Sequence, residues 1–367
     1  MTFDLSPQSV AVVLGTRPEV IKLAGIIELL GPAARLIHTG QHWDHELNQI
    51  FFREFRLPHP AVQLSIGGDL RGQQIGEGAA LLSEDLAHSR PRALVVQGDT
   101  NATLAGALAA NTNNVPVMHV EAGLRSFDRR MPEEHNRILT DHLSALCCAA
   151  TSTSKANLEA EGIAASKVVV TGNTVVEAVE QLLPPDRSEL LERFEVKPNE
   201  FVLATFHRPE NVDSAEPLRA ILSGLATLPL PVVLPLHPRT AARVSEFGLQ
   251  SLLTGLQVVE PIGYRDFLGL AADSAFLVSD SGGIQEEASV LKRPVIVVRR
   301  STERPEVLGT FATLVEPGDA MGIAAQSLLA DLDRVHAELA QLPSPYGDGT
   351  ASQRCVTALT EYLAGGT

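Results

Sequence analysis

The chain has 367 residues, of which 44% are hydrophobic, 20% charged and only 4% aromatic. This length suits about two domains, and the composition excludes a disordered chain and favours helices packed on sheets. The formal net charge of -15 argues against a general nucleic-acid binder, because such proteins need a broad basic surface. A small anionic ligand stays possible, since a local pocket can be positive on an acidic protein.

The cysteines and the N-terminus bear on the compartment. Cys147, Cys148 and Cys355 are too few, and odd in number, for a disulfide framework, so we expect a reducing cytoplasm. The first ten residues contain Asp4 and no basic residue, unlike a signal peptide. No apolar run approaches the roughly 18–20 residues of a membrane span, so we expect no membrane partner.

Short apolar runs alternate with helical patterns in the first half of the chain, and a helix is expected from about Pro18 to Leu30. This rhythm predicts a doubly wound parallel sheet, in which ligands bind at the carboxyl ends of the strands. Polar segments at Gly15–Pro18, Gly98–Thr100 and Glu121–Arg125 directly follow strands. The expected strands are Val10–Leu14, Arg35–His38, Ala93–Val96, Val117–Val120, Cys147–Ala150 and Val168–Val170.

The same rhythm occurs a second time. Two α/β domains of the Rossmann-like type are therefore predicted, joined near Leu182–Asn199 and with their strand ends around one cleft. The expected boundaries are 1–182 for the first domain and 200–342 for the second, with a C-terminal helix at about 350–367. The strands of the second domain are expected at Phe201–Thr205, Pro231–Leu236, Val258–Glu260, Phe276–Ser279 and Val295–Val298.

The sharpest single motif runs from Ser281 through Gly282 and Gly283 to Glu287. It follows an apolar strand and opens a helix, so its backbone N–H groups and the helix dipole favour a bound phosphate. Glu286 or Glu287 could then accept hydrogen bonds from a ribose diol. The alternative is an ordinary glycine-opened helix with acidic residues near its N-terminus.

Basic side chains follow two further predicted strands. Arg17 and Lys22 lie near the start of the first helix, where they oppose the helix dipole, and an anion between them would explain this placement. Arg17 could instead pair with Glu19. Arg299, Arg300 and Arg304 follow the strand Val295–Val298, and there Glu303 could simply hold Arg304.

Three carboxylates are candidates for proton transfer or for stabilising a cationic sugar carbon: Asp99, Glu121 and Glu133. Glu133 could also be only a helix-start residue. His207 ends a strand and is the best-placed histidine. His42 and His45 lack a convincing third ligand, so no metal is expected.

Together the motifs resemble the non-hydrolysing UDP-N-acetylglucosamine 2-epimerases, over about Val10 to Leu363. The resemblance rests on Gly15-Thr-Arg-Pro-Glu19, Gln97-Gly-Asp-Thr100, His119-Val-Glu-Ala-Gly-Leu-Arg125, Pro132-Glu-Glu-His-Asn-Arg137, Thr171-Gly-Asn173, His207-Arg208, Ser281-Gly-Gly-Ile-Gln-Glu-Glu287, Thr302-Glu-Arg-Pro305 and Pro345-Tyr-Gly-Asp-Gly349.

This resemblance implies the two-domain GT-B architecture, with the last helix packed on the first domain. It implies inversion at C2 of a UDP-sugar, by elimination of UDP to a glycal and re-addition, without NAD, metal or any other cofactor. It also implies a cytoplasmic homodimer that serves cell-surface polysaccharide biosynthesis.

The resemblance also implies roles for the individual residues that match the family's motifs. The resemblance assigns proton transfer and charge stabilisation to Asp99, Glu121 and Glu133, assisted by Lys22 and His207. The second domain would bind UDP. The residues expected to hold UDP are Arg17, Phe267, Ser281, Gly282, Gly283, Glu287 and Arg304, and Gln41 and His42 match a substrate or regulatory region.

Some features depart from the most familiar members. His207-Arg-Pro-Glu-Asn211 replaces His-Arg-Arg-Glu, and the loop Ser126–Arg130 is shorter. The segments Thr39–His45 and Phe51–Pro60 resemble a branch of the family that includes enzymes acting on modified sugars, such as a UDP-2,3-diacetamido-glucuronic acid, so the exact sugar stays open. The sequence is also compatible with a hydrolysing 2-epimerase, a GT-B glycosyltransferase or a nucleotide-sugar binding protein without turnover.

Overall fold

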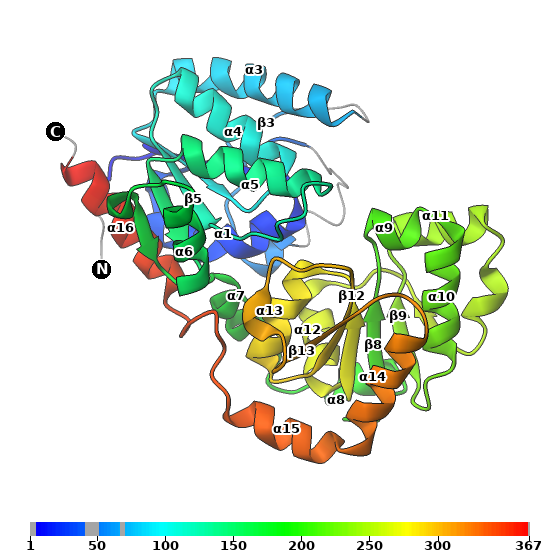
Figure 1. Ribbon diagram of the computed structural model, residues 1–367. Helices are drawn as coiled ribbons and strands as arrows, with labels where there is room; N and C mark the ends of the chain where they lie inside the picture. The colour runs from blue at the N-terminus through cyan, green and yellow to red at the C-terminus, as the bar shows by residue number, and fades with distance from the viewer. Residues whose placement is uncertain (1–4, 41–50, 67–69, 366–367) are drawn as a thin grey trace. The chain divides into compact units, whose positions relative to one another are not determined.

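The computed structural model describes residues 5–40, 51–66 and 70–365, and the chain divides into two compact units (Figure 1). Unit 1 comprises Met1–Glu180 and Tyr346–Thr367, and unit 2 comprises Gln181–Pro345. None of the helices in the described ranges is both long and apolar enough to span a bilayer.

Unit 1 is built on a seven-stranded parallel sheet with the order β3-β2-β1-β4-β5-β6-β7. Its central strands β1, β4 and β5 are buried along their whole length, which explains the unbroken apolar sequences of β1 and of Ala93–Val96 in β4. The strands are β1 Val10–Leu14, β2 Ala34–His38, β3 Val62–Gln63, β4 Ala93–Gln97, β5 Val117–Ala122, β6 Leu146–Ala149 and β7 Val168–Val170.

Helices cover both faces of this sheet (Figure 1), as is expected when the connections run in opposite directions from its centre. Helices α3, α4 and α5 lie side by side, and α16 packs against α1 (Figure 1). Ser352 of α16 donates its backbone N–H to Glu177, which joins the chain's last helix to unit 1. The helices are α1 Arg17–Leu30, α3 Arg71–Ser89, α4 Asn101–Thr112, α5 Pro132–Leu143, α6 Ser152–Ala160 and α16 Ala351–Gly365. Helix α7, Val175–Leu182, begins in unit 1, and its last residues Gln181 and Leu182 belong to unit 2.

Unit 2 repeats the plan with six parallel strands in the order β10-β9-β8-β11-β12-β13. The strands are β8 Val202–Thr205, β9 Val232–Pro235, β10 Gln257–Val259, β11 Phe276–Ser279, β12 Val295–Val298 and β13 Ala312–Val315. The helices are α8 Ser188–Arg193, α9 Pro209–Val212, α10 Ala215–Ala226, α11 Pro238–Glu246, α12 Tyr264–Asp273, α13 Gly282–Leu291, α14 Asp319–Ala330 and α15 Leu332–Gln341.

The predicted pair of doubly wound sheets is confirmed, with three local differences. β3 has only two residues, and β13 is an edge strand that is only partly buried, so neither carries a strong apolar pattern. The expected link at Leu182–Asn199 contains the short helix α8, whose Leu190 and Leu191 are buried.

Candidate active site

In each unit the candidate residues lie where the strand order changes direction, which is where open α/β sheets bind ligands. In unit 1 this point lies between β1 and β4, and in unit 2 between β8 and β11. Arg17 follows β1 and Asp99 follows β4, while His207 follows β8 and Ser281 follows β11. The expectation that polar segments follow these strands is therefore met within each unit.

Glu121 of unit 1 is a buried carboxylate with a buried cation beside it. The Nζ atom of Lys22 lies 2.7 Å from Oε1 and 2.7 Å from Oε2 of Glu121. The Nε2 atom of Gln97 also donates to Glu121. Lys22 therefore does not simply oppose the dipole of α1; its charge is balanced by Glu121.

The backbone of Glu121 is itself unusual. Its φ angle is 68°, in the left-handed region that residues other than glycine seldom adopt, and the β5–β6 register shifts between Val120 and Ala122. Irregularities of this kind re-aim a side chain and are frequent at functional sites. The sequence motif located this glutamate, but only the structure shows the strain at the end of β5.

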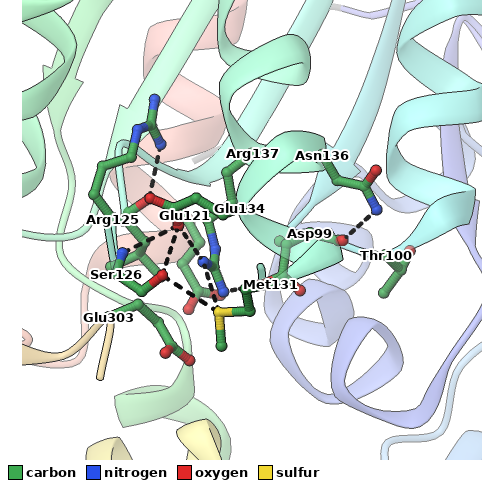
Figure 2. Close-up of polar contacts among 12 residues, drawn as sticks. Asp99, Thr100, Glu121, Arg125, Ser126, Met131, Glu134, Asn136, Arg137 and Glu303 are labelled. Carbon is green, nitrogen blue, oxygen red and sulfur yellow. Dashed lines mark hydrogen bonds and ion pairs between the residues drawn. The ribbon is translucent and has the colours of Figure 1, made fainter. Parts of the chain in front are cut away.

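Asp99 has a different environment. Its side chain is 28% exposed, and its Oδ2 atom lies 2.5 Å from Nη2 of Arg137 (Figure 2). The amide of Asn136 donates to the backbone carbonyl of Asp99 over 2.8 Å. Unit 1 thus brings together one sequestered carboxylate, Glu121, and one partly accessible carboxylate, Asp99.

Two further candidates of unit 1, Glu133 and Arg17, lie at the starts of helices. Glu133 is half-buried in the first turn of α5, and the guanidinium of Arg17 lies 6.0 Å from the ring centre of Phe51. Glu19 is buried and accepts the backbone N–H groups of Gly15 and Thr16, and burial raises its pKa. Gln41 and His42 lie outside the described residues.

In unit 2, Asp280 organises the turn that carries His207. It accepts the backbone N–H groups of His207 and Arg208 at 3.2 and 3.0 Å, and the amide of Asn211 at 3.1 Å. Nδ1 of His207 lies 3.3 Å from Oδ1 of Asp280. Burial alone would raise the pKa of Asp280, but the contacts with His207, Arg208 and Asn211 outweigh burial and lower it.

The two glycines that begin α13 differ in their surroundings. A Cβ atom on Gly282 would lie 2.7 Å from Oε1 of Glu303 and 2.9 Å from Nη1 of Arg304, so no larger residue fits without rearrangement. A Cβ atom on Gly283 would meet nothing closer than 3.8 Å. The first N–H groups of a helix have no acceptor within the helix, so this turn can bind an anion.

Glu286 and Glu287, both candidates for a ribose diol, lie in different environments. Glu286 is completely buried and accepts a 2.8 Å hydrogen bond from Nε of Arg304, so it is engaged inside the unit. Glu287 accepts the hydroxyl of Tyr264 over 2.9 Å. Phe267 is half-buried on α12, the helix that carries Tyr264.

Glu303 connects the arginines at the end of β12. It pairs with Nη2 of Arg299 at 2.7 Å and with Nη1 of Arg304, which confirms the simpler interpretation of the Glu303–Arg304 pair. Burial lowers the pKa of Arg299, while the adjacent Glu303 opposes that change. Arg304 is therefore fixed by Glu286 and Glu303, and it lies beside Gly282.

The described residues contain no group of three or more His, Cys, Asp or Glu side chains that could hold a metal ion. His42 and His45 are not among these residues. Cys147 and Cys148 are buried in β6, as expected for small apolar side chains, and burial raises the pKa of Cys147 to about 12.

Comparison with known proteins decides the family. A family model described as UDP-N-acetylglucosamine 2-epimerase matches residues 32–360. The UDP-N-acetylglucosamine 2-epimerase of Methanocaldococcus jannaschii is 40% identical over 364 residues, covering 95% of this chain and 98% of that protein. The chain belongs to the UDP-N-acetylglucosamine 2-epimerase family.

Solved epimerase structures share the whole architecture. The Methanocaldococcus jannaschii enzyme in complex with UDP-GlcNAc and UDP matches with a TM-score of 0.87 at 39% identity, over 96% of this chain and 99% of that chain. The UDP-GlcNAc 2-epimerase of Neisseria meningitidis bound to UDP-GlcNAc matches with the same TM-score at 32% identity, over 96% and 99%. The expected GT-B-type epimerase fold is thereby confirmed.

A relative of different specificity is also similar. The UDP-2,3-diacetamido-2,3-dideoxy-D-glucuronate 2-epimerase of Pseudomonas aeruginosa is 37% identical over 361 residues, covering 96% of this chain and 98% of that protein. The chain is therefore similar both to epimerases named for UDP-N-acetylglucosamine and to an epimerase named for a modified sugar.

Sequence reasoning missed several residues that shape the candidate sites of the two units. Arg137 and Asn136 lie within a quoted motif, yet nothing in the sequence shows that they contact Asp99. Asp280 immediately precedes Ser281, and its position one residue after a buried strand was a usable signal.

A buried chain of polar contacts ties two site loops of unit 1 together. Nε2 of His119 lies 2.8 Å from the carbonyl of Gly98, and its Nδ1 lies 2.6 Å from Asp141. Asp141 also accepts the N–H of Gly123 and pairs with Arg125 at 2.7 Å. Burial alone would raise the pKa of Asp141, but its contacts with His119 and Arg125 outweigh burial and lower the pKa.

Proposed function

We propose that this chain inverts C2 of UDP-N-acetylglucosamine to give UDP-N-acetylmannosamine, without net hydrolysis. Family membership supports this activity. The observation that carries the chemistry is the contrast between two carboxylates of unit 1. Glu121 is buried against Lys22, whereas Asp99 is partly exposed and its Oδ1 makes no hydrogen bond with a described residue.

The reaction needs such a contrast. The C2 proton is not next to a ketone, so it leaves only as the C1–O bond to UDP breaks and C1 becomes cationic. A base takes the proton, the C2–H electron pair forms the C1=C2 double bond of a glycal, and UDP departs with the C1–O electrons. Reprotonation on the other face of C2 and attack of UDP at C1 complete the inversion.

We assign the proton transfer and the stabilisation of C1 to Asp99, Glu121 and Glu133 together. Asp99 is the best-supported proton carrier, because it combines partial exposure with an oxygen that a substrate can reach. Lys22 and His207 assist at the departing phosphate in this proposal. The buried Lys22–Glu121 pair supplies fixed charges that need no reorganisation during the reaction.

We assign UDP binding mainly to unit 2. In this proposal the diphosphate lies at the start of α13, held by Ser281, Gly282 and Gly283, and Arg17 is a further residue assigned to the diphosphate. Glu287 accepts the ribose hydroxyls and Phe267 packs near the uracil, while Arg304 supports the turn through its contacts with Glu286 and Glu303. No cofactor enters the reaction.

The deciding experiment is incubation with UDP-N-acetylglucosamine in D2O, followed by NMR and mass spectrometry. We expect the C2 epimer, deuterium at C2 and UDP-sugar as the final product. Free N-acetylmannosamine and UDP would instead identify the hydrolysing reaction. Turnover that requires an acceptor would identify a glycosyltransferase, and binding of UDP-sugar without exchange would identify a sensing protein.

A second substrate is worth a parallel assay. The Pseudomonas aeruginosa relative is named for a 2,3-diacetamido-uronate, and the loop Ser126–Arg130 carries two exposed arginines that could face a sugar carboxylate. Exchange on that UDP-sugar, at a higher kcat/KM than on UDP-N-acetylglucosamine, would reassign the substrate and keep the chemistry.

We also infer a cytoplasmic homodimer that supplies cell-surface polysaccharide synthesis. The buried thiols of Cys147, Cys148 and Cys355 support a reducing compartment. Light scattering after size-exclusion chromatography tests the dimer, and a mass near 39.2 kDa would contradict it.

A further inference from the structure

Helix α5 of unit 1 has a buried face made of polar side chains. Its buried residues are Glu134, Asn136, Arg137, Thr140 and Asp141, whereas Leu139 of the same helix is 50% exposed. A surface helix normally buries its apolar side. Burying charges is unfavourable unless they are paired, so this inverted pattern calls for a specific role.

Arg137 is the centre of this face. It is 2% exposed, and its two terminal nitrogens bond to different carboxylates. Nη2 lies 2.5 Å from Oδ2 of Asp99, and Nη1 lies 2.7 Å from Oε2 of Glu134 (Figure 2). The guanidinium therefore bridges the partly exposed Asp99 and the buried Glu134.

Glu134 in turn anchors the loop before α5. It accepts the backbone N–H groups of Ser126 and Phe127 at 3.0 and 2.9 Å, and the hydroxyl of Ser126 at 3.1 Å. Phe127 has a φ angle of 59° and is 74% exposed, so the loop is held in a strained conformation. One chain of bonds thus runs from Asp99 through Arg137 and Glu134 to this loop.

We propose that Arg137 is the positioning residue for Asp99: it holds Oδ2 so that Oδ1 is presented to C2 of the sugar. The inference deepens the proposed function and rests on it. Only a planar, two-pronged cation can bond to Asp99 and Glu134 together, so lysine is not an equivalent replacement. A misplacement of about 1 Å at the reacting group can lower turnover 10²-fold.

The test uses Arg137→Lys, with the Asn136→Ala variant as a second probe of the same carboxylate through its backbone bond. We expect kcat for C2 exchange in D2O to fall about 10²-fold in Arg137→Lys, with KM and the affinity for UDP within about threefold of wild type. A smaller fall is expected for Asn136→Ala. A loss of UDP affinity parallel to kcat would mean general damage and would overturn the proposal.

A double-mutant cycle separates positioning from a structural role. If Arg137 acts through Asp99, Arg137→Lys should have almost no further effect on the residual exchange of Asp99→Asn. If the double variant instead loses activity by the product of the two single losses, the inference is overturned. If circular dichroism shows that Arg137→Lys does not fold, the cycle is run with Glu134→Gln, which weakens the same bridge. A Glu134→Gln protein that is unfolded, or that is fully active, would also count against the inference.

Arg35→Lys is the matched control. Arg35 makes a comparable two-pronged pair with Asp85, at 2.5 and 2.7 Å, between β2 and α3 of the same unit. Its replacement should leave kcat unchanged. If wild type itself shows no C2 exchange, the proposed function fails; if wild type exchanges and Arg137→Lys does so equally fast, only this inference fails.

Discussion

The Nζ atom of Lys22 lies 2.7 Å from both carboxylate oxygens of Glu121, although 99 positions separate the two residues in sequence. Lys22 comes from the second turn of α1 and Glu121 from the end of β5. Both side chains are almost completely buried. Each charge is therefore acceptable in the interior of unit 1 only because the other is present.

Removing one charge of this pair should strongly destabilise the protein. We expect Lys22→Ala to lower the free energy of unfolding by about 3–5 kcal/mol, because it leaves Glu121 buried and unbalanced. Urea unfolding followed by circular dichroism measures the change. Lys155→Ala is the control: Lys155 pairs with Glu159 at 3.7 Å on an exposed face, and its loss should change stability by about 0.5 kcal/mol or less.

Replacing both members by uncharged residues should recover much of that loss. Lys22→Met combined with Glu121→Gln removes the uncompensated charge, so stability should return towards wild type. C2 exchange should nevertheless be lost, because both residues belong to the proposed catalytic group. A double variant no more stable than Lys22→Ala would contradict this account of the pair.

The two glycines of α13 should respond differently to alanine. Gly283→Ala adds a Cβ with no neighbour closer than 3.8 Å, so the fold should be kept while UDP affinity falls at least about tenfold, because a phosphate can no longer approach the backbone. Gly282→Ala should lose both affinity and thermal stability. Isothermal titration calorimetry and thermal unfolding report the two effects.

Gly322 supplies the control for that pair. It lies in α14 and a Cβ there meets nothing within 4 Å, so Gly322→Ala should stabilise the helix by about 0.5–1 kcal/mol without changing UDP binding. If Gly283→Ala also bound UDP normally, the diphosphate would have to lie elsewhere.

Asp280 should make the stability of unit 2 depend on pH. Its pKa is lowered in the folded protein, so its ionised form stabilises the fold above its ordinary pKa of 3.8, and that contribution is lost as pH falls through the folded pKa. Asp280→Asn should therefore be destabilising near neutral pH, and the difference from wild type should shrink below about pH 4. Urea titrations at several pH values test this; a constant difference would refute it.

Asp99→Asn should impair turnover selectively. We expect kcat to fall at least about 10²-fold, because an amide cannot exchange the C2 proton, while UDP affinity stays close to wild type. Deuterium incorporation and calorimetry make the comparison. Normal exchange in the folded variant would remove Asp99 from the proton-transfer step.

Much of this protein could be predicted from its residues alone. Unbroken apolar runs such as Val10–Leu14 and Val295–Val298 predict buried parallel strands, since both faces of such strands are covered. The polar segments that follow them, with Asp99, His207 and Ser281, then mark the carboxyl edges of two sheets. The weak patterns of β3 and β13 escaped this reasoning because short or half-exposed strands need no apolar alternation.

Local sequence determined which segments form strands and which polar groups end them, because hydrophobic periodicity acts over a few residues. Only the tertiary structure decided the partner of each charge. The fold placed Lys22 against Glu121 and Arg137 against Asp99. It also paired Glu286 with Arg304, so Glu286 serves the interior of unit 2 and not a ligand. The physical reason is that pairing of buried charges depends on distances between atoms far apart in the chain, which are set by the order of strands in the sheet and the helices packed on it.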